Sequence, residues 1–211
     1  MQPYSGYSSL SLTVTSPAQD FTEPITLAEM KEYLNLPARS PADDAEDDLI
    51  NAMISGAREV AEILQGIDLL RKQYDLVSDY FWTYRIPLRG PLVSVDLFRY
   101  RDSDGAYTTL TENTDYIVDT SKHPGIIAPP YNSTWPTFTP WPSSAVLVRF
   151  TSGLSATDAF WNDAGKRIIM GMKLLVSMWY NNRLPYDTGR AAEYPFAVTS
   201  LLSFGARNNV R

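Results

Sequence analysis

Apolar residues recur every three or four positions in two long stretches of the chain, as in helices that bury one face. The first stretch carries Leu49, Ile50, Met53, Ile54, Ala57, Val60, Ala61 and Leu64. Gly66 follows it, and glycine is the residue that most often ends a helix. The second stretch runs from about Thr157 to Asn182 and carries Ile168, Ile169, Met172, Leu175, Val176, Trp179 and Tyr180.

Two shorter helices are predicted beside the long ones. Thr26 and Glu29 have the spacing of a capping box, in which each side chain accepts a hydrogen bond from the other residue's backbone. This helix buries Leu27, Met30, Tyr33 and Leu34 and stops at Pro37. The last helix begins after Pro195 and carries Val198, Leu201 and Leu202.

Between the long helices the pattern changes to the two-residue alternation of strands. Strands are expected at 71–80, 84–88, 93–101, 106–110, 116–119 and 145–151. Asp104-Gly105 predicts a hairpin, because glycine supplies the positive φ that a tight turn requires. Six prolines between 124 and 142, with Trp135 and Trp141, indicate an ordered loop.

This order of elements predicts an α+β fold in which an antiparallel sheet is inserted into a small helical bundle. The expected divisions are an extended arm at 1–24, the bundle at 25–67 and 153–204, the β lobe at 68–152 and a tail at 205–211. In the arm, Leu10, Leu12 and Val14 alternate and could add one strand to a neighbour's sheet.

Composition excludes several classes of site. The 211 residues include no cysteine and one histidine, so disulfides, thiolate metal sites and zinc sites rich in histidine are excluded. No apolar run has the length of a membrane span, and the N-terminus lacks the pattern of a secretion signal. The expected setting is therefore a reducing cytoplasm or an assembly made there, without contact to a membrane.

Charge is distributed unevenly along the chain. The net charge of −6 divides into −8 for residues 1–66, −1 for 67–156 and +3 for 157–211. A balance this acidic argues against a general nucleic-acid binder. Opposite charges at the two ends suit copies that pack head to tail, or two different partners, although chance differences between solvated helix faces explain them equally well.

Catalytic signals are weak. His123 lies in a turn-like Ser-Lys-His-Pro-Gly context, and no catalytic serine motif is present. The acids Asp43, Asp44, Glu46, Asp47 and Asp48 could bind a hard cation, but the favourable placement of acids at a helix start explains them better. We therefore predict no catalytic residue, no metal site and no cofactor.

Large aromatic residues and basic residues near the C-terminus are the candidates for an interface with a partner protein or with another subunit. The candidate interface residues are Trp179, Tyr180, Arg183, Phe196, Leu201, Phe204, Arg207 and Arg211. An ordinary core role is an equally good reading for Trp179. The acids at 43–48 are the candidate channel or inter-subunit face.

Several stretches, in this order and spacing, resemble the head–tail connector (adaptor) proteins of long-tailed phages and related gene-transfer particles. They are 25–34, 47–50, 57–62, 91–95, 104–105, 115–119, 135–136, 148–153, 179–183 and 194–198. The resemblance covers about 25–204, and no single stretch is diagnostic.

The resemblance implies a ring, expected to be a dodecamer, that docks beneath the portal protein in the neck of the virion. Such a ring is assembled in the host cytoplasm, extends the DNA channel and receives a tail-side stopper or tail-terminator protein. Genomic DNA would pass through the lumen without specific binding, and the segment after Pro185 is the candidate portal-binding arm.

Three alternatives remain open from the sequence. One is another neck or tail-completion protein. A second is a hydrolase that uses a pair of carboxylates, which would need two acids in one cleft with opposed pKa shifts. The third is a carbohydrate-binding β module with exposed Trp135 and Trp141, which leaves the helices unexplained.

Overall fold

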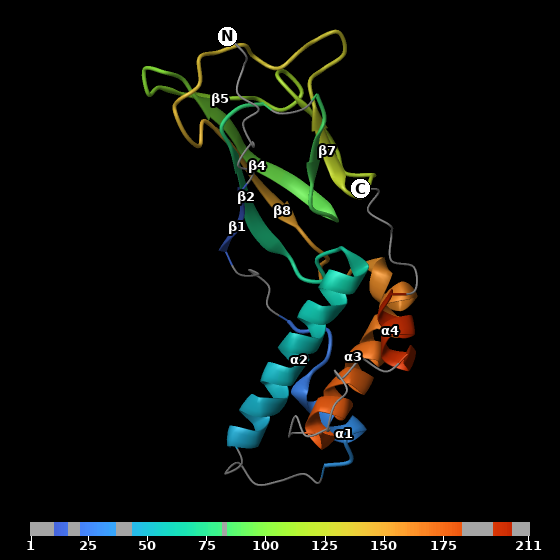
Figure 1. Ribbon diagram of the computed structural model, residues 1–211. Helices are drawn as coiled ribbons and strands as arrows, with labels where there is room; N and C mark the ends of the chain where they lie inside the picture. The colour runs from blue at the N-terminus through green and yellow to red at the C-terminus, as the bar shows by residue number, and fades with distance from the viewer. Residues whose placement is uncertain (1–10, 17–21, 37–43, 82–83, 183–195, 204–211) are drawn as a thin grey trace. The chain divides into compact units, whose positions relative to one another are not determined.

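The computed structural model describes residues 11–16, 22–36, 44–81, 84–182 and 196–203, which belong to two compact units (Figure 1). The helical unit comprises residues 21–70 and 154–211, and the β unit comprises 1–20 and 71–153. The predicted α+β class is confirmed, since antiparallel strands are inserted between helical segments from the two ends of the chain.

The described part of the helical unit contains four α-helices and one short 3-10 helix. They are α1 (Leu27–Tyr33), α2 (Asp44–Gln65), η1 (Ala159–Asn162), α3 (Ala164–Asn181) and α4 (Phe196–Ser203). The predicted capping box is present, with Glu29 N donating to Thr26 Oγ1 at 3.2 Å and Thr26 N donating to Glu29 Oε2 at 2.9 Å. Gly66 ends α2 with a φ of +68°, as its position predicts.

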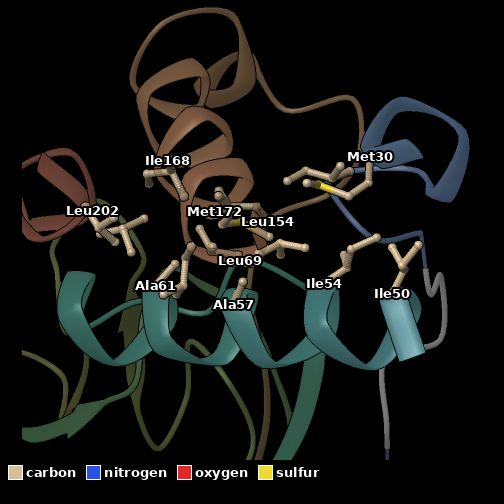
Figure 2. Packing of buried hydrophobic residues seen from close by; sticks show 14 residues of the cluster. Met30, Ile50, Ile54, Ala57, Ala61, Leu69, Leu154, Ile168, Met172 and Leu202 are labelled. Atoms are coloured by element: carbon tan, nitrogen blue, oxygen red, sulfur yellow. The ribbon is translucent and has the colours of Figure 1, made fainter. Parts of the chain in front are cut away.

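The helical core forms where α2 meets α1, α3 and α4. Figure 2 shows Ile50, Ile54, Ala57 and Ala61 of α2 directed toward residues of the other segments. All four are at most 1% exposed. The two alanines leave room for the larger core side chains opposite them, which include Met30, Leu69, Ile168, Met172, Leu175 and Leu202. The predicted apolar stripes of both long helices are therefore buried against each other.

The predicted long C-terminal helix begins seven residues later than expected. Asp158 instead caps η1 by accepting a hydrogen bond from Phe160 N at 3.0 Å. The Trp161 indole then turns back, and its Nε1 donates to Ser155 O at 2.9 Å. Gly165 makes space for this ring, because a Cβ there would lie 2.7 Å from Trp161 Cε3. The tryptophan therefore interrupts the helical path before α3 begins.

The β unit contains two antiparallel sheets. The five-stranded sheet has the order β1 (Ser11–Ser16), β2 (Lys72–Ser78), β8 (Val146–Ser152), β4 (Leu92–Arg101) and β5 (Tyr107–Thr109). The three-stranded sheet has the order β3 (Ile86–Leu88), β7 (Gly125–Ala128) and β6 (Ile117–Asp119). The predicted hairpin joins β4 to β5 through Gly105, whose φ is +85°.

The β core lies between apolar faces of both sheets. Phe98 and Phe150 of the five-stranded sheet and Ile86 and Ile127 of the three-stranded sheet are fully buried in one cluster. Aromatic rings extend this cluster, with Phe81 stacked on Trp135 at 5.2 Å between ring centroids. Trp135 is thus half-buried in the core rather than fully exposed.

Two strand predictions need correction. The first strand, β1, pairs with β2 of its own chain, from Ser11 opposite Val77 to Ser16 opposite Gln73, rather than with a neighbour. The stretch 124–142, which is predicted to be a proline-rich loop, contains β7. Its prolines flank Gly125–Ala128 and do not interrupt this strand. A Cβ at Gly125 would lie 2.5 Å from Leu92 Cβ, so glycine is required where β7 meets this side chain.

Candidate assembly surfaces

The aromatic end of α3 lies against α2. Trp179 is half-buried, and its ring lies 3.5 Å from where a Cβ on Gly56 would stand. Tyr180 donates a hydrogen bond from its hydroxyl to Glu46 Oε1 at 2.6 Å. The structure thus brings together one candidate interface residue and one residue of the candidate acidic face, and both Trp179 and Tyr180 use part of their surface to hold the helical unit together.

Some of the acidic side chains at the start of α2 have partners within the helical unit, and another is exposed to solvent. Glu46 accepts the tyrosine hydrogen bond, and Asp47 forms an ion pair with Lys31 of α1. Asp48 is exposed. Asp44 begins α2, but its side chain and all of Asp43 lie outside the described residues. Asp48 is therefore the described acid of this set that is open to solvent on the surface.

The last helix exposes one large aromatic side chain. Phe196 at the start of α4 is 86% exposed, although it is apolar. Leu201 lies over α3, where its Cβ is 3.3 Å from the position that a Cβ on Gly171 would take. The remaining predicted interface residues, Arg183, Phe204, Arg207 and Arg211, lie outside the described residues. Phe196 is therefore the described candidate best placed to contact a partner.

A buried ion network that the sequence analysis missed fixes the segment before α1 to α2. Arg58 donates from Nε to Glu23 Oε2 at 3.0 Å and from Nη1 to Glu62 Oε2 at 3.1 Å. The second carboxylate oxygen of Glu62 accepts from Leu69 N at 3.0 Å. The side chains of Arg58 and Glu62 are only 5% and 4% exposed. The four-residue spacing of Arg58 and Glu62 on a buried helix was the available signal.

Two arginines near the β4–β5 hairpin stack on aromatic rings. The Arg99 guanidinium lies 4.3 Å from the Tyr107 ring centroid, and that of Arg101 lies 3.9 Å from the Trp141 ring. Arg101 also donates from Nε to Gly105 O at 3.1 Å. The Arg101 guanidinium is also 5.2 Å from the Tyr107 ring centroid, so both arginines fix the Tyr107 side chain against β4. Nothing in the local sequence pattern indicated the Arg101–Trp141 stack, because Trp141 comes from a distant loop.

The outward face of the five-stranded sheet carries polar side chains that pair with one another. Arg149 makes two hydrogen bonds of 2.8 Å to the carboxylate of Asp75 on the neighbouring strand. These bonds raise the pKa of Arg149, which therefore stays charged. Asp96 accepts hydrogen bonds from Gln73, Ser94 and Thr151. The acids of this face thus have partners within the sheet.

An open pocket of about 570 Å³ lies beside the aromatic cluster of the β unit. The described residues that line it are Tyr80, Phe81, Tyr84 and residues 134–138, and none of these has a carboxylate. In the described ranges, no three His, Cys, Asp or Glu side chains are grouped so that they could hold a metal ion. None of the described helices has the length and apolar character that crossing a membrane requires.

No family model and no curated protein matches the chain. Solved structures do match. A chain of the "Neck of empty GTA particle computed with C6 symmetry" aligns with a TM-score of 0.67 and 20% identity, covering 91% of this chain and 93% of that one. A chain of the "Virion of native gene transfer agent (GTA) particle" gives 0.65 and 20%, covering 90% and 92%. A chain of the "Neck of native GTA particle computed with C12 symmetry" gives 0.61 and 21%, covering 91% and 92%. The chain thus shares its fold with these proteins over nearly the whole length of both.

Proposed function

We propose that this protein is a structural subunit of the neck of a phage-like particle, in the role of the head–tail connector (adaptor). The observation that carries the proposal is the shared fold over 90–91% of this chain with chains from gene transfer agent neck and virion structures. The order of sequence stretches that resemble adaptor proteins supports the same role. In this role the protein binds and positions other proteins and catalyses no reaction.

The proposed assembly is a ring, with the portal protein on one side and a tail-side stopper or tail-terminator protein on the other. Two of the matching structures were computed with C6 and C12 symmetry, which is compatible with a dodecamer. A closed ring needs two different faces on each subunit. The opposite charges of the first 66 and last 55 residues suit such faces.

Direct binding to the portal separates an adaptor from the other neck components. The purified chain is mixed with purified portal rings, without any other neck protein, and the complex is weighed by native mass spectrometry. Twelve copies per portal are expected. If the protein does not bind the portal alone, but binds once another neck protein has been added, it would be a stopper or terminator instead.

The portal contact is assigned to the segment after Pro185, for which Phe196 is the described anchor. Replacing Phe196 by alanine is expected to weaken portal binding by at least tenfold, because an exposed aromatic residue often dominates an interface. Ile63 of α2, which is 75% exposed, provides the control substitution Ile63→Ala. Equal loss of binding in the two variants, or normal binding after deletion of residues 204–211 together with Phe196→Ala, would reject this assignment.

The acidic start of α2 is proposed to face the DNA channel or the adjacent subunit. An acidic lumen lets duplex DNA slide, because many contacts between lysine or arginine side chains and the DNA phosphates would hold the DNA in place. Assembled rings are expected not to retain duplex DNA on a gel at low salt. The variant Asp48→Lys should increase retention if the residue faces the channel, and should lower ring stability without DNA retention if it faces the neighbouring subunit.

A further inference from the structure

The five-stranded sheet ends on both sides in a strand that lacks an outer neighbour among the described residues. These strands are β1 and β5. On the β5 side, Leu110 N donates to Phe98 O at 2.8 Å and Asp102 N donates to Ala106 O at 3.1 Å. Hydrogen-bonded pairs alternate along an antiparallel ladder, so the backbone N–H and C=O of Tyr107 and Thr109 point away from β4.

Neither edge strand carries a charged side chain or a proline, which are two of the features by which proteins prevent edge strands from pairing. β1 has the sequence SLTVTS, and β5 has the sequence YTT. Leu12 and Val14 of β1 are 47% and 51% exposed. They lie opposite Leu76 and Tyr74, which are buried in the β core. The apolar face of the sheet therefore extends to β1, where the described residues leave Leu12 and Val14 about half exposed.

Strand direction determines how the two edges could meet. Each neighbouring pair in the order β1-β2-β8-β4-β5 is antiparallel, so β1 and β5 run in the same direction. A second copy displaced sideways would place its β1 alongside β5, parallel to it, and would leave its own β5 open for a third copy. This contact is heterologous, and repetition with a small rotation closes a ring.

We propose that β1 of one copy pairs with β5 of the next copy, so that the five-stranded sheets continue around the assembly. The proposal rests on the proposed function, because it names the surface through which ring subunits meet. The stacks of Arg99 and Arg101 on Tyr107 hold this side chain over β4, and all three residues of β5 are exposed. Pairing over only Tyr107–Thr109 adds few hydrogen bonds, so we expect it in the portal-bound ring and not between free monomers.

Cysteine cross-linking gives a direct test, because the chain has no cysteine of its own. Thr13 and Thr109 lie on the polar face of the two edge strands, opposite Asp75 and Arg99. Within one chain four strand spacings, about 19 Å, separate the edges, which is far beyond the reach of a disulfide. The double variant Thr13→Cys/Thr109→Cys can therefore be cross-linked only between copies. Ser11→Cys/Thr109→Cys covers a register two residues away.

The portal-bound rings are oxidised and run on a denaturing gel without reductant. A ladder from dimer to the full ring is expected for at least one double variant, and monomer for each single variant. Dimers from Thr13→Cys alone would show two-fold pairing of β1 with β1 and would overturn the proposal. A complete portal-bound ring without any cross-linked ladder would also overturn it and would leave the proposed function intact. Failure to bind the portal at all would overturn both.

A backbone variant tests the same edge without cross-linking. Thr109→Pro removes an outward N–H, whereas Thr109→Val keeps it with a side chain of similar size. Portal-bound rings of the proline variant are expected to lose copies at least tenfold faster on dilution than rings of the valine variant. Equal loss from the two rings, with both variants folded by circular dichroism, would count against pairing at β5.

Discussion

The Tyr180 hydroxyl, in the last turn of α3, donates a hydrogen bond of 2.6 Å to Glu46 Oε1 in the first turn of α2, 134 residues earlier in the chain. The bond connects the aromatic end of one long helix to the acidic start of the other. It also gives the Glu46 carboxylate, a member of the candidate acidic face, a partner within the helical unit. The two residues therefore belong first to the stability of the helical unit.

Replacing Tyr180 by phenylalanine removes this hydrogen bond and keeps the ring. The free energy of unfolding is expected to fall by about 1 kcal/mol, because the acceptor is charged but only part-buried. Urea denaturation measures the change. Tyr131→Phe is the control, since Tyr131 is 92% exposed. A Tyr180→Phe variant as stable as that control would mean that the bond contributes nothing.

Glu59 and Glu62, two of the three glutamates that contact Arg58, lie in different surroundings and should differ in their effect on stability. Glu62 is 3.1 Å from Arg58 and buried, whereas Glu59 is 3.8 Å away and 67% exposed. Glu62→Ala leaves a buried guanidinium and the N–H of Leu69 without this acceptor, and we expect it to cost about 3 kcal/mol or more. Glu59→Ala should cost less than about 0.5 kcal/mol. Similar midpoints in urea for the two variants would contradict the assigned network.

Two helical glycines should respond in opposite ways to alanine. At Gly56 an added Cβ meets the Trp179 ring at 3.5 Å, an ordinary contact, so Gly56→Ala should stabilise the protein by about 0.5–1 kcal/mol through helix propensity. At Gly171 the Cβ would lie 2.6 Å from Cδ2 and 2.9 Å from Cγ of buried Leu202. Gly171→Ala should therefore lower the melting temperature by displacing α4. Melting temperatures that rise in both variants would show that α4 yields easily.

The capping box of α1 should give a pH-dependent contribution to stability. The hydrogen bond from the Thr26 backbone lowers the pKa of Glu29, against a smaller opposing effect of burial. A lowered pKa in the folded state stabilises the fold above the ordinary glutamate pKa, and this gain is lost as the pH falls through the folded value. The difference in unfolding free energy between wild type and Glu29→Gln should therefore be positive at pH 7 and shrink below about pH 4. A difference that grows on acidification would have the wrong sign.

Features that depend on neighbouring residues were predictable from the sequence. The Thr26 cap, the stop at Gly66 and the hairpin at Gly105 each follow from residues within one turn of each other. The buried faces of the long helices follow from periodicity alone. The predicted interface residues could be chosen by type, but their burial could not, because the partners of Trp179 and Tyr180 come from the other end of the chain.

Features that depend on distant contacts were not predictable. The sequence cannot show that β1 pairs with β2, because an alternating strand fits any open edge. Prolines concealed β7, whose pairing with β3 and β6 decides its structure. The Arg101–Trp141 stack and the Arg58–Glu23 ion pair join residues that only the fold brings together.

The segment 71–153 of the β unit leaves and rejoins the helical unit through two paired strands. Lys72 of β2 lies directly opposite Ser152 of β8, so the two ends of this segment are about 5 Å apart. A turn of a few residues could therefore span the gap in place of residues 71–153. The inserted segment can therefore differ in size or surface between relatives while the helices of the other unit keep their packing.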